Sequence, residues 1–277
     1  MKPPPDFSLR CFVVAILDIM GESERLCEIR DLPDSDLDMR SFRGKVDRAL
    51  GPVYKMREAF KTQVANLVKG IEMAAPGLSL AYEMQTFGDS VVVYHEYDAD
   101  NLPSVAVTHA ALLSCAVIVL LSLQIDIPIR CGIELGMATD ELFEHEIFGP
   151  VLAEAHHIES HVASFPRIVV GPRLVADLAR VSAGPPAPRN QFDRLNRFAA
   201  YKCGELLKKD VDGQWVVDYL GDVFTATVKD ELDVRKEGEK AYRRMLEQEA
   251  KFAGSGNSKV AGVYTRLRAY FESRGFG

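Results

Sequence analysis

The chain has 277 residues, of which 47% are hydrophobic and 26% are charged, and its formal net charge is −7. This composition is typical of a soluble globular protein with one large domain, or with one domain and an extension. The negative net charge argues against a surface that wraps nucleic acid. The five cysteines form no CxxC pair, which favours buried thiols in a reducing cytoplasm over a disulfide framework or a zinc site.

The start of the chain, MKPPPDFSLR, lacks the apolar core of a signal peptide. The most apolar stretch, residues 110–123, is shorter than the ~20 residues that a membrane-spanning helix needs. We therefore expect this stretch to be a buried helix, and the protein to be cytoplasmic without contact to a membrane.

Apolar spacing and turn residues place the secondary structure along the chain. The run at 11–21 is continuously apolar, as in a buried central strand. Pro52 is expected to start or interrupt the first helix, and Ser104 to cap the second. In chain order the predicted elements are a strand over 11–21, a helix over 42–75, strands over 78–84 and 90–97 joined by a Gly88-Asp89 turn, a helix over 104–123, a strand over 127–139, a turn and helix over 146–165, and a strand over 166–171.

The order β-α-β-β-α-β predicts an α+β fold with a ferredoxin-like palm, in which helices cover one face of an antiparallel sheet. We assign residues 1–181 to this domain and 182–190 to a Pro-rich loop. Residues 191–277 are expected to form an extension of a helix, a β-hairpin and two charged helices.

Two acidic residues are expected to meet at one edge of this sheet. Asp18 ends the first strand, and Asp89 begins the antiparallel strand beside it. Two carboxylates held close together repel, which raises at least one pKa, and divalent cations such as Mg²⁺ or Mn²⁺ remove that penalty. Two such ions can support phosphoryl transfer. The alternative is that Asp89 is only a turn residue and Asp18 only a helix cap, both solvated.

Four stretches in order along residues 10–172 resemble the catalytic domain of the class III nucleotide cyclases: LDIMGES, TFGDSVVVY, IRCGIELG and IFGPVLAEAHHIES. The resemblance implies two Mn²⁺ or Mg²⁺ ions held by Asp18, Asp89 and the carbonyl of Ile19. It further implies a phosphate-binding arginine and a turn facing the triphosphate, which fall at Arg130 and at Gly21 and Glu22.

The sequence departs from this family at four positions. Ala153 and His157 occupy the places of an Asn and an Arg that stabilise the transition state, and neither replaces such donors well. Gln85 and Glu146 occupy the places of the purine-selecting Lys and its acidic partner. The chain is therefore not expected to be an ordinary adenylate or guanylate cyclase.

Arg40 or Arg43 is one candidate for the two missing roles; the alternative is that both are solvated charges. His156, His157 and His161 share one predicted helix, but no third ligand is evident. We interpret them as surface or interface histidines and not as a zinc site.

A narrower similarity joins GPVLAEAHHIESHVASFPRIVVG and LKKDVDGQWVVDYLG to the pyrimidine cyclases of Pycsar antiphage defence. It implies a homodimer with sites between subunits that converts UTP or CTP to a 3′,5′-cyclic monophosphate, a messenger for a separate effector protein. The amide of Gln85 can donate to and accept from a pyrimidine edge but does not decide between the two bases. We favour UTP.

Two other functions stay open. A cyclase-like domain without activity could bind a nucleotide or a partner, as Ala153 and His157 suggest. A polymerase-like palm that makes dinucleotides shares the two-metal arrangement, but the turn TFGDS differs from the GGDEF-like turn of such proteins. Retention of Asp18, Asp89 and Arg130 favours the cyclase.

Overall fold

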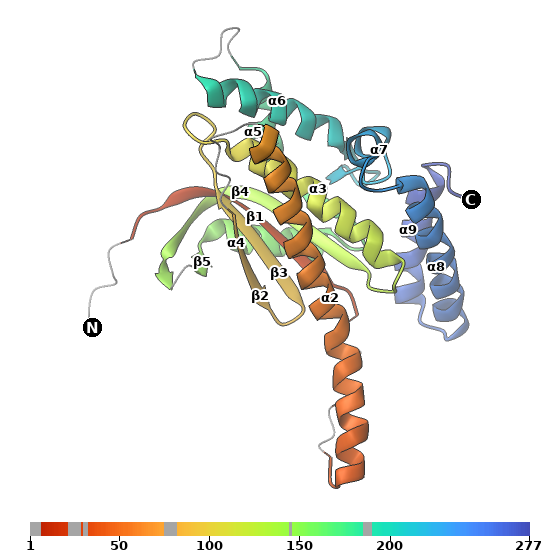
Figure 1. Cartoon of the computed structure of the whole chain (residues 1–277). Coiled ribbons are helices and arrows are strands. Elements are labelled where there is room, and N and C mark those ends of the chain that lie inside the picture. Colours follow the sequence, from red (N-terminus) through yellow and green to blue (C-terminus); the bar gives the residue numbers. More distant parts are fainter. Residues whose placement is uncertain (1–6, 22–28, 30–32, 75–81, 144–145, 185–189) are drawn as a thin grey trace.

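The computed structural model describes residues 7–21, 29, 33–74, 82–143, 146–184 and 190–277. Within these residues the strands form one sheet in the order β2-β3-β1-β4-β6-β8-β7, with β5 paired to β4 (Figure 1). The elements are β1 (Arg10–Ile19), α2 (Asp36–Ala74), β2 (Glu83–Phe87), β3 (Ser90–Glu96), α3 (Ser104–Leu123), β4 (Ile129–Phe143), β5 (Glu146–Phe148), α4 (Pro150–His157), the π-helix η1 (Ile158–Val162), β6 (Ile168–Val170), α5 (Pro172–Ser182), α6 (Gln191–Leu206), β7 (Leu207–Lys209), β8 (Trp215–Val217), α7 (Asp222–Val228), α8 (Val234–Gly254) and α9 (Ser258–Glu272).

The predicted α+β fold with a ferredoxin-like palm is confirmed, but the prediction that helices cover one face of the sheet is wrong, because α2 and α3 pack on one face and α4 packs on the other. β1 lies between β3 and β4 and is antiparallel to both, while β2 and β3 form the predicted hairpin. Gly88 has φ +54° in the turn of that hairpin, a backbone conformation that favours glycine. Beyond the palm, β6 runs parallel to β4, and the β7–β8 hairpin continues the sheet through pairing of β8 with β6.

Alternate residues of β1 enter two different cores, as the two-residue period of a strand requires. The larger core, which also contains residues of α2 and α3, takes Val13, Ala15 and Leu17. A smaller core on the opposite face, which contains residues of α4, takes Phe12, Val14 and Ile16.

α3 is the buried helix expected from its composition. Among the described residues it is the helix long and apolar enough to cross a membrane, yet 89% of that window is buried inside the protein. Ser104 is not its cap: Pro103 takes that position, and the Ser104 hydroxyl accepts a hydrogen bond from the N–H of Asp98 at 3.1 Å. The serine hydroxyl therefore accepts a hydrogen bond from the loop that precedes α3 and does not cap the helix.

The prediction for Pro52 is wrong. α2 begins at Asp36, six residues before the predicted start, and continues through Pro52. Ala49, Val53 and Phe60 are buried on either side of the proline, so packing outweighs the hydrogen bond that proline removes. The N-terminal half of α2 projects beyond the sheet (Figure 1).

Other boundaries also differ from the predictions. The predicted first hairpin strand, 78–84, is β2 at Glu83–Phe87, and residues 75–81 lie outside the described part of the chain. The predicted helix over 146–165 is divided into β5, α4 and η1. α5 and α7 were not predicted, and residues 185–189 of the predicted Pro-rich loop lie outside the described residues.

Candidate functional site

One row of residues crosses four strands of the palm at the end of β1. Asp18 pairs with Ser90 of β3 on one side and with Arg130 of β4 on the other, and Ser90 pairs with Phe87 of β2. Residues opposite each other in antiparallel strands point to the same face of a sheet. This cross-strand row (Phe87, Ser90, Asp18, Arg130) therefore shares the face that α4 covers.

Asp89 lies beside this row, in the hairpin turn directly before Ser90. Burial raises the pKa of Asp89, and the charge of Asp18 adds to the shift, while Arg130 and Arg57 oppose it. The expectation that the two carboxylates lie at one edge of the sheet is confirmed. Their role as metal ligands stays a prediction.

The Arg130 guanidinium joins several groups of the site. It donates hydrogen bonds to Oδ2 of Asp18 from Nη2 at 3.0 Å and from Nε at 3.3 Å. Its Nη1 donates to the carbonyl of Ser160 at 3.1 Å, and its Nε lies 2.5 Å from Oε1 of Glu159. Arg130 thus connects the end of β1 to η1.

Glu159 is a site residue that the sequence analysis missed. Its side chain is only 2% exposed. Burial, followed by the negative charge of Asp18, raises the pKa of Glu159 to about 7, although Arg130 opposes the shift. Around Arg130, three carboxylates (Asp18, Asp89 and Glu159) thus interact with one guanidinium.

Gly132 explains how Glu159 comes so close to the sheet. A Cβ at this position would lie 2.4 Å from the Ala155 carbonyl oxygen and from the Glu159 backbone nitrogen. Only a residue without a side chain lets the end of α4 approach β4 this closely. The π-helix then follows, a local change of helical register that is frequent at functional sites.

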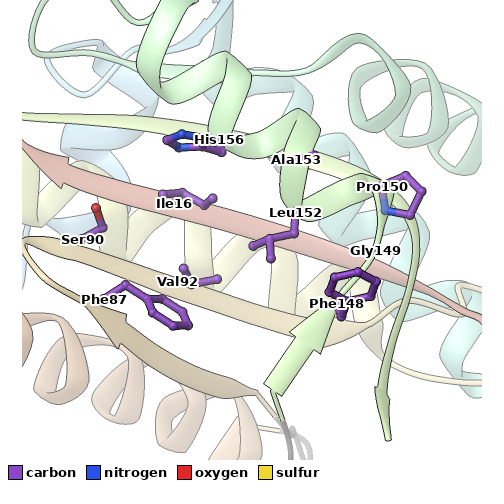
Figure 2. A pocket seen from close by; sticks show the side chains of 10 residues that line it. All are labelled: Ile16, Phe87, Ser90, Val92, Phe148, Gly149, Pro150, Leu152, Ala153 and His156. Atoms are coloured by element: carbon purple, nitrogen blue, oxygen red, sulfur yellow. The ribbon is translucent and has the colours of Figure 1, made fainter. Parts of the chain in front are cut away.

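A cavity of about 650 Å³ opens over the same face, between the β2–β3 hairpin and α4 (Figure 2). Ile16 and Val92 line it from the sheet, and the partly exposed rings of Phe87 and Phe148 line it from β2 and β5. Its lining is mostly apolar, as in sites for small organic ligands. The cross-strand row lies at its edge, because Phe87 and Ser90 belong to both.

Among the described residues, two polar side chains line this cavity, and both contact the carboxylates around Arg130. Ser90 Oγ donates to Oδ1 of Asp18 at 2.8 Å. His156 Nδ1 lies 3.2 Å from Oε2 of Glu159. His156 was predicted to be a surface histidine; it is indeed exposed, but it also lines the cavity.

The two residues proposed to select the base lie near one phenol. Gln85 Nε2 donates to Tyr94 Oη at 3.0 Å. Burial and the charge of Glu83 raise the pKa of Tyr94 to about 12, and the charge of Glu146 contributes to the same shift. Gln85 pairs with Val92, two cross-strand pairs away from Phe87 and Ser90, so it faces the cavity side of the sheet.

The remaining predicted positions are more scattered. Gly21, with φ +83°, lies two residues after the end of β1, while Glu22 lies outside the described residues. Ala153 lines the cavity, and the ring of His157 stacks on that of His161 with centroids 4.9 Å apart.

Arg40 and Arg43, the candidates for the missing donors, are exposed in the first turns of α2. Among the described residues, no contact joins Arg40 or Arg43 to the cross-strand row. Their proposed role therefore stays a prediction.

No protein-family model and no curated protein matches the chain. Two solved structures resemble its fold, each described as a bacterial light-regulated adenylyl cyclase. One is 15% identical with a TM-score of 0.39, and the match covers 61% of this chain and 44% of that one. The other is 12% identical with a TM-score of 0.43, and the match covers 81% of this chain and 100% of that one. The chain thus spans less than half the length of the first of these two proteins. Conclusions about function rest on the site itself.

The carboxylates of Asp18 and Asp89 together fit a site for a divalent cation. Within the described residues, no three side chains of His, Cys, Asp or Glu form a metal centre. The expected set needs only Asp18, Asp89 and the carbonyl of Ile19, all hard oxygen donors of the kind that Mg²⁺ and Mn²⁺ prefer. Burial and the charge of Asp18 raise the pKa of Asp89, and a cation between the two carboxylates would oppose this shift.

Proposed function

We propose that the protein is a pyrimidine nucleotide cyclase, which converts UTP in preference to CTP to the 3′,5′-cyclic monophosphate and diphosphate. The observation that carries this proposal is the cross-strand row, which places the Asp18 carboxylate and the Arg130 guanidinium together at the edge of an apolar cavity, with the Asp89 carboxylate beside them. We assign the activity to residues 1–181, with residues 191–277 as an extension.

In the proposed reaction, the ribose 3′-oxygen bonds to the α-phosphorus. The bond from that phosphorus to the bridging oxygen breaks, diphosphate leaves, and the hydroxyl proton passes to solvent. Asp18, Asp89 and the Ile19 carbonyl would hold Mn²⁺ or Mg²⁺. Such ions, when bound, acidify the attacking hydroxyl and neutralise the phosphates.

Arg130 would bind the departing phosphates. Its guanidinium now donates from two nitrogens to one carboxylate oxygen of Asp18, and the same planar fork suits phosphate oxygens. A cation on Asp18 would replace the charge that Arg130 supplies there. The arginine could then turn to the substrate, while Gly21 bends the backbone after β1 towards the phosphates.

The cavity suits a nucleobase. Its volume of about 650 Å³ is typical of small-molecule sites, and the Phe87 and Phe148 rings offer stacking surfaces. Gln85 faces this side of the sheet two cross-strand pairs from Phe87, where its amide could donate to and accept from a pyrimidine. Glu146 would contribute through its position near Tyr94.

The cellular role follows from the resemblance to the pyrimidine cyclases of antiphage defence. The cyclic product would be a second messenger for a separate effector protein. Two copies of the chain would form a homodimer with the sites between them.

The second candidate is a cyclase-like domain that binds nucleotide without converting it. Ala153 favours it, because its methyl group lines the cavity where a hydrogen-bond donor is expected. The ion pair of Arg130 with buried Glu159 also favours it, because this pairing competes with phosphate.

One experiment separates these candidates. The purified protein is incubated with each of the four nucleoside triphosphates and Mn²⁺, and the products are identified by mass spectrometry. Binding of a non-hydrolysable UTP analogue is measured in parallel. We expect cyclic UMP from the wild type and from the control Asp230→Asn, which alters an exposed carboxylate between α7 and α8. We expect none from the double variant Asp18→Asn/Asp89→Asn. Analogue binding without a product would favour the second candidate, and product from the double variant would contradict the cyclase mechanism.

A further inference from the structure

Among the described residues that line the cavity, His156 is the one with an ionisable side chain. It lies on α4 three positions after Ala153, which cannot donate a hydrogen bond. Its imidazole is 66% exposed, so a ligand in the cavity can reach it. In Figure 2, His156 and Ser90 lie towards the same end of the cavity, and Phe148 and Pro150 lie towards the other. The cavity therefore has a polar end and an apolar end.

The polar end is tied to the acidic cluster through a chain of contacts. His156 Nδ1 lies 3.2 Å from Oε2 of Glu159, and the other oxygen of this carboxylate lies 2.5 Å from Nε of Arg130. Arg130 in turn donates to Asp18. Glu159 itself is held in place because its side chain is buried and its backbone packs on Gly132. A buried carboxylate that contacts one nitrogen of an exposed imidazole fixes the orientation of the ring.

We propose that His156 contacts a phosphate group of the nucleotide from the α4 side of the site, and that Glu159 is the residue that positions it. With Nδ1–H directed at the Glu159 carboxylate, Nε2–H is the donor available to a phosphate oxygen. The ring then lies between two groups of acceptor oxygens, those of Glu159 and those of the phosphate. This assignment rests on the proposed nucleotide function and adds a donor that the sequence analysis did not identify.

The charges of the site support a donor at this position. Asp18, Asp89 and Glu159 surround one guanidinium, so a triphosphate approaching the row meets three carboxyl groups and one cationic side chain. Cations on Asp18 and Asp89 would compensate for the charge on the β1 and β3 side. On the α4 side, where Ala153 has no hydrogen-bond donor in its side chain, His156 is the described residue lining the cavity that can donate to a phosphate oxygen.

The test compares His156→Ala with the control His157→Ala, which removes the neighbouring exposed imidazole that does not line the cavity. Turnover of UTP with Mn²⁺ and the dissociation constant of a non-hydrolysable UTP analogue are measured for each, together with thermal melting. We expect His156→Ala to lower kcat about 100-fold and to weaken analogue binding by about 10-fold, since one donor to developing charge has effects of this order. His157→Ala should stay within about twofold of the wild type.

The role of Glu159 is tested by combining its substitution with that of His156. Glu159→Gln keeps an oxygen that accepts from His156 but removes the charge, and it should lower kcat about 10-fold with less change in KM. In the His156→Ala background the same substitution should have little further effect, because its action passes through the imidazole. A purely structural role would instead lower the melting temperature and act equally in both backgrounds.

The outcomes separate this proposal from the cyclase proposal. If the wild type forms no cyclic product but binds the analogue, and His156→Ala weakens that binding, the cyclase proposal fails and the phosphate contact stands. If the wild type is active and His156→Ala equals it, or if His157→Ala loses as much, the assignment of His156 is overturned. Failure of the wild type to bind the analogue or any of the four triphosphates overturns both.

Discussion

On the α2 and α3 side of β1, Val13, Ala15 and Leu17 are at most 2% exposed and belong to one large apolar core. On the α4 side, the apolar contribution of the strand ends at Ile16, which already borders the cavity, and the next residue on that face is Asp18. One strand therefore supplies stability on one face and charge on the other. Because the two faces share a backbone but no side chains, substitutions should affect either stability or activity.

The largest effect should come from the charged face. Asp89→Asn should lower turnover by at least about 1,000-fold, about 4 kcal/mol in the activation barrier, because it removes a ligand of the proposed cations. It should not lower stability, because burial and the neighbouring charge of Asp18 both disfavour the ionised Asp89 carboxylate in the folded protein. Steady-state assays and urea unfolding measure the two quantities. Destabilisation of the size expected for a core residue would contradict the separation of the faces.

The opposite face should give the opposite result. Leu17 precedes Asp18, is fully buried, and packs in the large core. Leu17→Ala should lower the free energy of unfolding by about 3 kcal/mol, a typical cost of a large-to-small change in a core. Below its melting temperature the variant should keep kcat within a few-fold of the wild type. A variant that is folded and stable but inactive would show that the two faces are coupled.

At Gly132, one substitution should lower both stability and turnover. An added methyl group would overlap the backbone of α4 and η1, so the helix must move. Gly132→Ala should cost about 2 kcal/mol of stability and about 10-fold in turnover, because Glu159 moves with the helix. Gly204→Ala is the matched control: nothing lies within 4 Å of its added Cβ, it is in α6, and alanine should stabilise the helix slightly. Equal effects of the two substitutions would contradict the close approach at Gly132.

The charged row could be predicted from the sequence, whereas the helix above it could not. The apolar run of β1 and the Gly88-Asp89 turn fix which strands are neighbours and where they end. This is enough to bring Asp18 and Asp89 together. Arg130 was expected only from the resemblance to the class III cyclases, and its place beside Asp18 comes from the structure. Glu159 escaped prediction because a glutamate near the end of an exposed-looking helix is expected to be solvated. Its burial depends on the π-helix and on Gly132 of a distant strand.

Two other failures have different causes. Pro52 is a strong local signal for a helix end, but the apolar side chains around it pack well enough to outweigh that signal. α5, by contrast, carries Leu174, Leu178 and Val181 at helical spacing, and all three are buried. The signal for this helix was therefore present in the sequence and was not used.

The smallest of these effects concerns a polar residue on the stable face. His95 pairs with Val13, so it points into the α2 and α3 side, where its Nε2 lies 3.1 Å from the Thr108 hydroxyl. Burial lowers the pKa of His95 to about 4, below the ordinary value of 6.5. The unfolded chain therefore binds a proton first as the pH falls through 6.5, and the folded state loses stability between pH 6.5 and 4. Between pH 7.5 and 5.5 this loss should be about 1 kcal/mol, and His95→Asn should lack it while remaining active. Urea unfolding of both proteins at the two pH values measures the difference. If the variant showed the same pH dependence as the wild type, His95 would have to be charged or solvated in the folded protein. Water would then reach this face of the sheet.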